Sequence, residues 1–180
     1  MATSTAPPLR QELRFTRVAS GARIAWARSG RGPVLLRAGH WMTHVEYDTV
    51  SALFRPWLEQ LGRRVTLIRY DERGAGLSGA DDVPLGLDAA VEELEVVGRA
   101  ACGDAPHALL GISGGAPPAI AYAARHPGRV SRLLLLGAYS HGLLHREITA
   151  DQRAYAEAQA SLMALGWGVP NTPVQQFINA

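Results

Sequence analysis

Short apolar runs alternate along the chain with segments that repeat at the period of a helix. Residues 13–18 and 22–27 alternate apolar and polar side chains on either side of Ser20-Gly21, which predicts a β-hairpin with one solvated face. The later runs are apolar without alternation, as in strands that are buried on both faces of a parallel sheet. They cover residues 34–36, 65–70, 107–112 and 130–136.

Amphipathic helices are predicted between these strands. Residues 50–61 place apolar side chains at positions i, i+3, i+4 and i+7, and Pro56 inside this segment indicates either a late start or a kink. Residues 87–101 set an apolar face against a glutamate-rich face, and Gly103 ends that helix. Further helices are expected over residues 116–125 and 147–165, the second with Tyr155, Ala158, Leu162 and Leu165 on one stripe.

This alternation predicts an α/β fold: a mostly parallel sheet with an N-terminal antiparallel hairpin and helices on both faces. Residues 1–11 are rich in Ala, Thr and Pro, and we expect them to form a flexible tail. Sheets of this kind bind their ligands at the carboxyl ends of the strands. Candidate chemistry should therefore follow Leu36, Tyr70, Ile112 and Gly137.

Composition and charge narrow the class of protein. Of the 180 residues, 47% are hydrophobic and 19% are charged, as in a globular protein. All 18 basic residues are arginines, spread along the chain with Arg63-Arg64 as the only adjacent pair, which argues against a nucleic-acid partner. Cys102 is the single cysteine, which excludes an intramolecular disulfide and a zinc site built on several thiolates. Since no apolar run approaches the roughly 20 residues that cross a bilayer, and no apolar signal core is present, we expect a cytoplasmic protein without a membrane partner.

The strongest motif is Gly111-Ile112-Ser113-Gly114-Gly115, which matches G-x-S-x-G. It stands between a predicted strand and a predicted helix, where this motif places a nucleophilic serine on a sharp, strained turn. Gly111 and Gly115 leave room for that turn, and the N-terminus of the helix favours negative charge beside Ser113. The alternative is a glycine-rich tight turn without chemistry.

A second glycine-rich stretch, residues 74–79, matches the dinucleotide fingerprint G-x-G-x-x-G. The preceding strand ends three residues before Gly74, and no apolar helix follows at once. We therefore prefer a structural interpretation, in which Asp71 and Arg73 are buried and shape the carboxyl edge of the sheet. A dinucleotide site is the weaker alternative.

Together these motifs resemble those of the α/β-hydrolase superfamily. The shared features are D-x-R-G-x-G-x-S at residues 71–78, G-x-S-x-G at the nucleophile turn, and His126-Pro127 after the next helix. The stretch Trp41-Met42-Thr43-His44-Val45-Glu46-Tyr47-Asp48 and residues 165–168 resemble, more narrowly, modules found beside adenylate-cyclase and helix-turn-helix regulators in bacteria. The resemblance covers residues 12–178 and is specific for the fold, not for the substrate.

The resemblance implies a serine hydrolase that acts on a small ester or similar acyl compound, with Ser113 as nucleophile. It implies an oxyanion hole formed by the backbone N–H of Gly114 and by that of His40 or Trp41, and the choice between these two stays open. No metal or organic cofactor is implied. The expected partner is a small-molecule substrate or ligand.

The triad of this superfamily runs in the order serine, acid, histidine. Its acid and histidine follow strands that lie beyond Leu136, so the resemblance assigns residues 12–141 to the core and 142–180 to the beginning of a helical cap, with the fold incomplete at its C-terminus. His141 and His145 are candidates for the base, although a cap or loop role is preferred for both. His44 is interpreted as a loop-packing residue, with a substrate-facing role as the weaker alternative. His126 is interpreted as structural, and His107 lies at the wrong end of its strand to reach the site.

Two functions remain open from the sequence. The first is a hydrolase whose turnover is impaired because the acid and the histidine of the triad are absent. The second is a non-catalytic or truncated module that senses a small ligand. The sheet is expected to end in an exposed edge at residues 130–136, which favours self-association.

Overall fold

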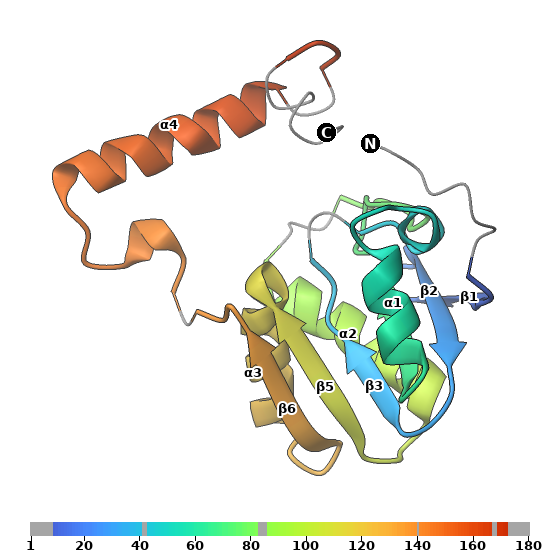
Figure 1. Cartoon of the computed structure of the whole chain (residues 1–180). Helices are drawn as coiled ribbons and strands as arrows, with labels where there is room; N and C mark the ends of the chain where they lie inside the picture. Colours follow the sequence, from blue (N-terminus) through green and yellow to red (C-terminus); the bar gives the residue numbers. More distant parts are fainter. Residues whose placement is uncertain (1–8, 41–42, 83–85, 140, 167–168, 173–180) are drawn as a thin grey trace. The chain divides into compact units, whose positions relative to one another are not determined.

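The computed structural model describes residues 9–40, 43–82, 86–139, 141–166 and 169–172 (Figure 1). The chain divides into two compact units, one within residues 3–138 and one within residues 139–180. None of the described helices combines the length and the apolar character needed to cross a membrane.

The described part of the first unit is built on a mixed six-stranded sheet in the order β1-β2-β4-β3-β5-β6. β1 (Glu12–Arg17) and β2 (Arg23–Gly30) form the antiparallel hairpin, and β2 also pairs antiparallel with β4. The parallel strands are β3 (Val34–Arg37), β4 (Thr66–Tyr70), β5 (His107–Ile112) and β6 (Val130–Leu136). The predicted fold class is therefore confirmed.

Helices cover both faces of this sheet. The unbroken apolar strands follow from that layering, because neighbouring residues of β3 point to opposite sides: Leu35 packs with Leu58 of α1, whereas Leu36 packs in one cluster with Leu94 of α2. In Figure 1, α1 lies in front of the sheet, and α2 and α3 lie behind it. The helix bounds are α1 (Arg55–Gly62), α2 (Leu87–Cys102) and α3 (Ala116–Arg125).

The first helix begins later than residue 50. A short 3-10 turn, η1 (Tyr47–Thr49), precedes it, and Pro56 falls within the first turn of α1. Proline is tolerated there because its missing N–H would have no partner inside the helix. The late start is thus the correct one of the two alternatives, and no kink is needed.

The second unit holds a 3-10 turn, η3 (Leu143–His145), and the long helix α4 (Ala150–Gly166). The expected start of that helix at residue 147 is wrong. The Thr149 hydroxyl accepts the Gln152 backbone N–H at 3.2 Å, and the side-chain Oε1 of Gln152 accepts the Thr149 N–H at 3.0 Å, a capping box that begins the helix at Ala150.

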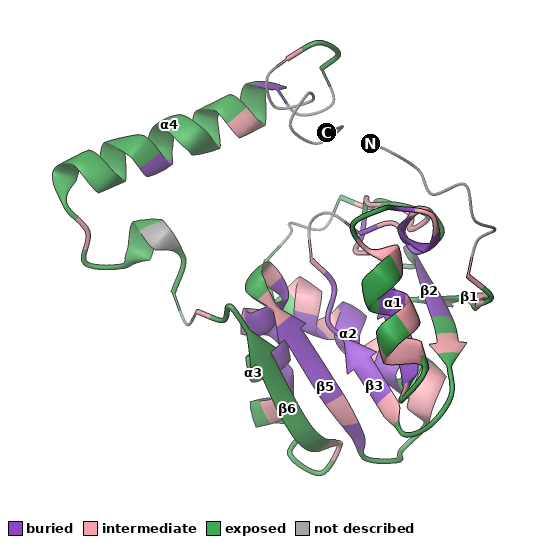
Figure 2. Ribbon diagram, in the orientation of Figure 1, coloured by how far each residue is buried: buried purple, intermediate pink, exposed green. Residues whose placement is uncertain are grey.

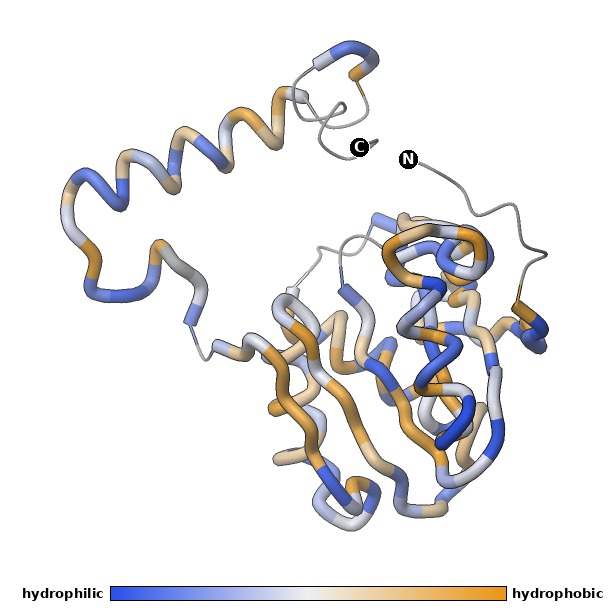
Figure 3. Tube along the Cα trace, in the orientation of Figure 1, coloured by the Kyte–Doolittle hydropathy of each residue, from blue (hydrophilic) through white to orange (hydrophobic). Residues whose placement is uncertain are grey.

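β6 stands at one end of the described strand order and is exposed along most of its length (Figure 2). Its four leucines are 37–52% exposed, although the strand is as hydrophobic as its buried neighbour β5 (Figure 3). They are Leu133, Leu134, Leu135 and Leu136.

The connections of the parallel strands reverse direction between β3 and β5. From β3 the chain crosses through α1 to β4 on one side, whereas from β5 it crosses through α3 to β6 on the other side. In open α/β sheets, the crevice outside the carboxyl ends of two such strands is where ligands bind. The strand order therefore brings Ala38–His40 and Ser113–Gly115 together at one crevice.

Candidate active site

Ser113 lies on a sharp turn between β5 and α3. The turn is a single 3-10 turn, η2 (Ser113–Gly115), and the serine is exposed. Its φ angle is +48°, a left-handed conformation that costs a non-glycine residue roughly 1–2 kcal/mol. Strain of this kind persists only where the surrounding structure holds the backbone in place.

Gly111 and Gly115 provide that constraint by close packing. A Cβ atom at Gly111 would lie 2.8 Å from Cα of Ala116, and one at Gly115 would lie 2.7 Å from the carbonyl oxygen of Gly39. Cβ atoms essentially never come within 3.0 Å of such neighbours, so both positions require glycine unless the backbone shifts. Close packing thus explains why glycine is needed at the two positions predicted to support the turn.

The backbone after β3 is joined to the same turn. Arg37 pairs with Leu110 in the parallel ladder, and the N–H of Ala38 donates to the Leu110 carbonyl oxygen at 2.9 Å. The next carbonyl, that of Gly39, is the one that packs on Gly115. Gly39 is itself confined, since a Cβ atom there would lie 2.7 Å from Cγ of Glu72.

The predicted oxyanion donors therefore stand on two adjacent segments. Gly114 directly follows the exposed Ser113, and His40 directly follows Gly39. Trp41 lies outside the described residues. The choice between His40 and Trp41 as the second donor stays a prediction.

The side chain of His40 is engaged by Arg37. One guanidinium nitrogen of Arg37 contacts Nε2 of His40, which must then accept the hydrogen bond because the guanidinium has only donors. Burial, with a further contribution from the Arg37 charge, lowers the pKa of His40 to about 4. The imidazole is therefore neutral near pH 7 and carries its proton on Nδ1.

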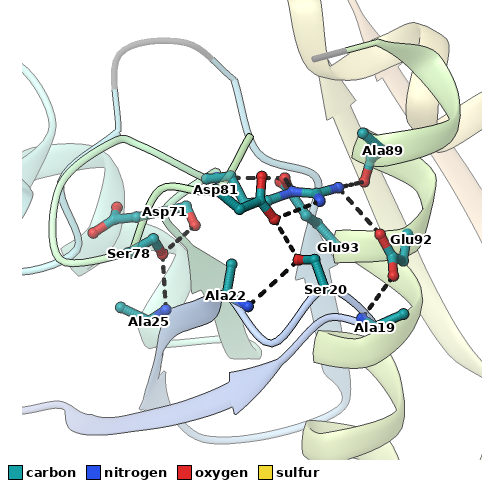
Figure 4. Close-up of polar contacts among 11 residues, drawn as sticks. Ala19, Ser20, Ala22, Ala25, Asp71, Ser78, Asp81, Ala89, Glu92 and Glu93 are labelled. Carbon is teal, nitrogen blue, oxygen red and sulfur yellow. Dashed lines mark hydrogen bonds and ion pairs between the residues drawn. The ribbon is translucent and has the colours of Figure 1, made fainter. Parts of the chain in front are cut away.

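Asp71 ties the segment after β3 to the loop after β4. Its carboxylate accepts the N–H of Val45 on one oxygen and the N–H of Leu77 on the other, each at 2.9 Å. The Ser78 hydroxyl donates to the Asp71 carbonyl oxygen at 2.6 Å and accepts the Ala25 N–H at 2.8 Å (Figure 4). Asp71 is fully buried, and burial raises the pKa of its carboxyl group.

This loop is built around a protein carboxylate and not around a phosphate. The Gly76 backbone, at φ +50°, lies directly against the Asp71 carboxylate, and the Leu77 amide already donates to it. The following helix, α2, begins only at Leu87, so the glycines do not open a helix N-terminus as a dinucleotide fingerprint requires. The geometry favours the structural interpretation of residues 71–79.

The sequence model for the alpha/beta hydrolase fold matches residues 32–161, more than two thirds of the chain. The chain belongs to the alpha/beta hydrolase fold family. No curated protein matches the chain at a significant level.

Solved structures agree with this α/β-hydrolase assignment. An alpha/beta hydrolase from Sphaerobacter thermophilus is 26% identical, with a TM-score of 0.62, over 93% of this chain and 65% of that protein. A hydrolase from Pseudomonas aeruginosa shares the fold at 22% identity and a TM-score of 0.63, over 93% of this chain and 66% of that protein. An epoxide hydrolase from Vigna radiata does so at 18% identity and a TM-score of 0.61, over 82% and 46%. This chain spans less than two thirds of the length of each of these proteins.

Arg73 of this α/β hydrolase is the centre of a buried ionic cluster. Its guanidinium, 1% exposed, donates to Glu93 at 2.7 Å, to Glu92 at 3.1 Å and to Asp81 at 3.2 Å. Figure 4 shows the three carboxylates converging from the loop and from α2. Since Asp81 also contacts the Ser20 hydroxyl, the cluster ties the loop after β4 and α2 to the hairpin.

Glu72, between the two predicted support residues, was not singled out from the sequence. Its side chain lies against Gly39 and lines a cavity of about 160 Å³ together with Glu93 and the first turns of α2. Burial, and then the charge of Glu93, raise the pKa of Glu72 to about 7. In the motif D-x-R at residues 71–73, Glu72 stands at the x position, which any residue can occupy. The motif therefore gives no indication of a carboxyl group with a raised pKa there.

The sequence analysis also did not identify the buried arginine in the apolar strand β4. Arg69 donates to the Asp48 carboxylate at 2.8 Å, to the Val45 carbonyl oxygen at 3.1 Å and to Gln11 at 2.8 Å. Gln11 also donates to Val45 at 2.9 Å, so this end of the expected tail is bonded to the core, while residues 1–8 lie outside the described residues. A charge inside an unbroken apolar run is the signal that would have indicated such a pair.

The four histidines described in the first unit all have structural partners. His40 is held by Arg37, and Nδ1 of His44 accepts the Tyr47 N–H at 3.1 Å. His107 lies at the amino end of β5, buried, with Nδ1 3.1 Å from the Ala105 carbonyl oxygen. His126 packs against Tyr122, with ring centroids 4.7 Å apart and ring planes tilted by 44°. Each of these contacts agrees with a packing or structural role.

His141 and His145 belong to the second unit. Their predicted role, as base or as cap residues, stays a prediction. Across the described residues, no group of three or more His, Cys, Asp or Glu side chains is placed to hold a metal ion.

Proposed function

We propose that this α/β hydrolase cleaves small carboxylic esters or similar acyl compounds through Ser113. The observation that supports this most is the left-handed backbone of Ser113, exposed at the carboxyl end of β5 and enclosed by Gly111 and Gly115. A strained, non-glycine residue at this point of the sheet is what a nucleophile elbow requires. A merely tight turn would be cheaper with glycine at position 113.

The proposed reaction is acyl transfer followed by hydrolysis. The Ser113 oxygen attacks the carbonyl carbon of the substrate, its proton passes to solvent water, and the carbonyl oxygen becomes an oxyanion. The N–H groups of Gly114 and of His40 or Trp41 donate to that oxyanion, beside the positive end of α3. The intermediate then expels the alcohol, which takes up a proton, and water hydrolyses the acyl-serine to the acid. Residues 142–180 are proposed to be the beginning of a helical cap.

Turnover is proposed to be slow, because the described histidines of the first unit have other partners. Without a base the serine remains a weak nucleophile near neutral pH. In serine hydrolases that lack triad groups, the oxyanion hole and substrate binding still accelerate the reaction about 10³–10⁴-fold over water. Such a residual rate is the expectation for this chain. A module that binds a small ligand without turnover is the competing proposal, supported by the same engaged histidines.

The test is labelling of the full chain with a fluorophosphonate, followed by peptide mass spectrometry. We expect one phosphonylated serine, Ser113, with no labelling of Ser113→Ala. Ser161→Ala is the matched control, because Ser161 is an exposed serine of α4 whose hydroxyl donates to the Glu157 carbonyl oxygen. Absence of labelling at Ser113, together with saturable binding of an acyl compound that is released unchanged, would favour the ligand-binding module.

A further inference from the structure

Arg37 is a charged residue at the end of an apolar, central strand. It is the last residue of β3, it pairs with Leu110 of β5, and only 4% of it is exposed. It lies on the α1 face of the sheet, with its guanidinium carbon 5.9 Å from the centre of the Phe54 ring. Burying a guanidinium costs free energy unless it is hydrogen-bonded to acceptors. The acceptors that contact Arg37 therefore indicate its role.

The carboxylate whose charge acts most strongly on Arg37, that of Asp48, already accepts a hydrogen bond from another arginine. Asp48 receives the 2.8 Å bond from Arg69, and Arg69 is also bonded to the backbone of Val45. The Arg37 Nε has no partner among the described residues. Among the described residues, the Arg37 guanidinium donates a hydrogen bond to Nε2 of His40.

His40 can serve as this acceptor only as neutral imidazole. A protonated ring would place two cations in contact and would have no lone pair on Nε2. Burial lowers the pKa of Arg37 most; among its ionisable neighbours, Asp48, Tyr70 and Asp71 raise that pKa, and Arg69 lowers it. A guanidinium stays protonated in proteins and can only donate, which keeps His40 in one tautomer.

We infer that Arg37 is a positioning residue, which acts through the imidazole of His40 to set the backbone at residues 39–40 beside Ser113. The Ala38 N–H fixes one end of this segment on β5, and the Gly39 carbonyl oxygen packs on Gly115. The hydrogen bond from Arg37 to the His40 ring fixes the other end of residues 38–40. If the His40 N–H is the second oxyanion donor, its position depends on where this contact holds residue 40. The effect of Arg37 on the reactivity of Ser113 rests on the proposed function. Its effect on the position of residues 39–40 does not.

Two measurements on the full chain test this inference separately. ¹⁵N-histidine NMR reports the tautomer and the pKa of His40 directly, whether or not Ser113 reacts. Fluorophosphonate labelling, resolved into the affinity of the reversible complex and the rate of bond formation, reports the reactivity of Ser113. The variants are Arg37→Met, which removes the donors, and Arg37→Lys, which keeps a cationic donor. Arg31→Met is the matched control, an exposed arginine in the turn between β2 and β3.

In Arg37→Met we expect His40 to lose its exclusive Nδ1–H tautomer and its pKa to rise from about 4, although burial, the larger cause, still holds it below 6.5. Bond formation at Ser113 should slow at least 10-fold with little change in the affinity of the reversible complex. Arg37→Lys should restore the tautomer and most of the rate, and Arg31→Met should change neither.

An unchanged tautomer and pKa of His40 in Arg37→Met would overturn the inference, even if labelling falls. So would a loss of reversible affinity alone, because that would indicate a contact with the ligand and not positioning. If wild-type Ser113 takes no label, the proposed function fails, and the His40 spectrum alone then decides whether Arg37 holds residue 40.

Discussion

The carbonyl oxygen of Gly39 lies so close to Gly115 that a Cβ atom at position 115 would come within 2.7 Å of it. This contact joins the segment after β3 to the turn that carries Ser113. The two segments are 76 positions apart in the chain, and the strand order alone makes them neighbours.

Gly115→Ala should therefore damage both stability and reactivity. The new methyl group must push the Gly39 carbonyl away, and overpacking of this kind costs about 1–3 kcal/mol. Urea unfolding should show that loss, and labelling of Ser113 should slow. Gly128→Ala is the control, since a Cβ atom there meets nothing within 4 Å. Equal stability of the two variants would contradict the packing argument.

The left-handed backbone of Ser113 predicts an unusual order of stability between two variants that both lack the hydroxyl. Ser113→Gly should be more stable than Ser113→Ala by about 1 kcal/mol, because glycine adopts φ +48° without the Cβ strain. Thermal unfolding of the pair checks this. In an ordinary position glycine would be the less stable of the two, so the opposite order would show that the strain is absent.

Arg73→Met should be strongly destabilising. It leaves Glu93, buried and bonded to Arg73 at 2.7 Å, without its cation, and breaking a buried pair in this way costs about 3–5 kcal/mol. Arg99→Met breaks the exposed pair with Glu95 and should cost less than about 1 kcal/mol. Denaturant midpoints compare the two. Similar losses would mean that the buried cluster adds no more than a surface pair.

Glu72 should make stability fall as the pH rises. Its folded pKa is raised from 4.5 to about 7, so between these values the folded protein retains a proton that the unfolded chain has released. Its contribution is fully present below pH 4.5 and is lost as the pH rises through about 7. Glu72→Gln should therefore gain stability relative to wild type from pH 4.5 to 7.5. A stability difference that stays flat across this range would refute the assignment.

His40 acts with the opposite sign in an overlapping range. Its folded pKa is lowered from 6.5 to about 4, so the unfolded chain takes up a proton first as the pH falls. Its contribution is present above pH 6.5 and is lost towards pH 4. The Glu72 effect must for this reason be measured as a difference between variants and not from the wild-type curve alone.

The exposed leucines of β6 predict self-association. β6 is the last strand in the order of the described strands, and its apolar side chains, 37–52% exposed, can associate with a second copy of this chain. Sedimentation should show a concentration-dependent dimer, and Leu135→Lys should shift it to monomer. Leu53→Lys changes an exposed leucine outside the sheet and should have no effect. A wild-type monomer at all concentrations would contradict this prediction.

Much of the fold could be predicted because its signals are local. Alternation around Ser20-Gly21 indicated the hairpin, unbroken runs indicated β4 and β5, and Gly103 ended α2 at φ +59°. The start of α4 was missed although its signal was also local, a Thr149–Gln152 capping box two residues beyond the expected start. The motif around Ser113 carried its own structural context, so the strained turn could be expected before any coordinates.

The fold class and the residue on the strained turn follow from the amino-acid sequence, because periodicity and turn chemistry depend on near neighbours in the chain. The surroundings of that residue come from the packing of distant segments against one another. That Gly39 touches Gly115, that Arg37 binds the ring of His40, and that Glu72 faces Glu93 depend on which strands lie side by side and on which groups are buried together. Burial is also what shifts the pKa values of His40 and Glu72, and the burial of one group is a property of the whole packed chain.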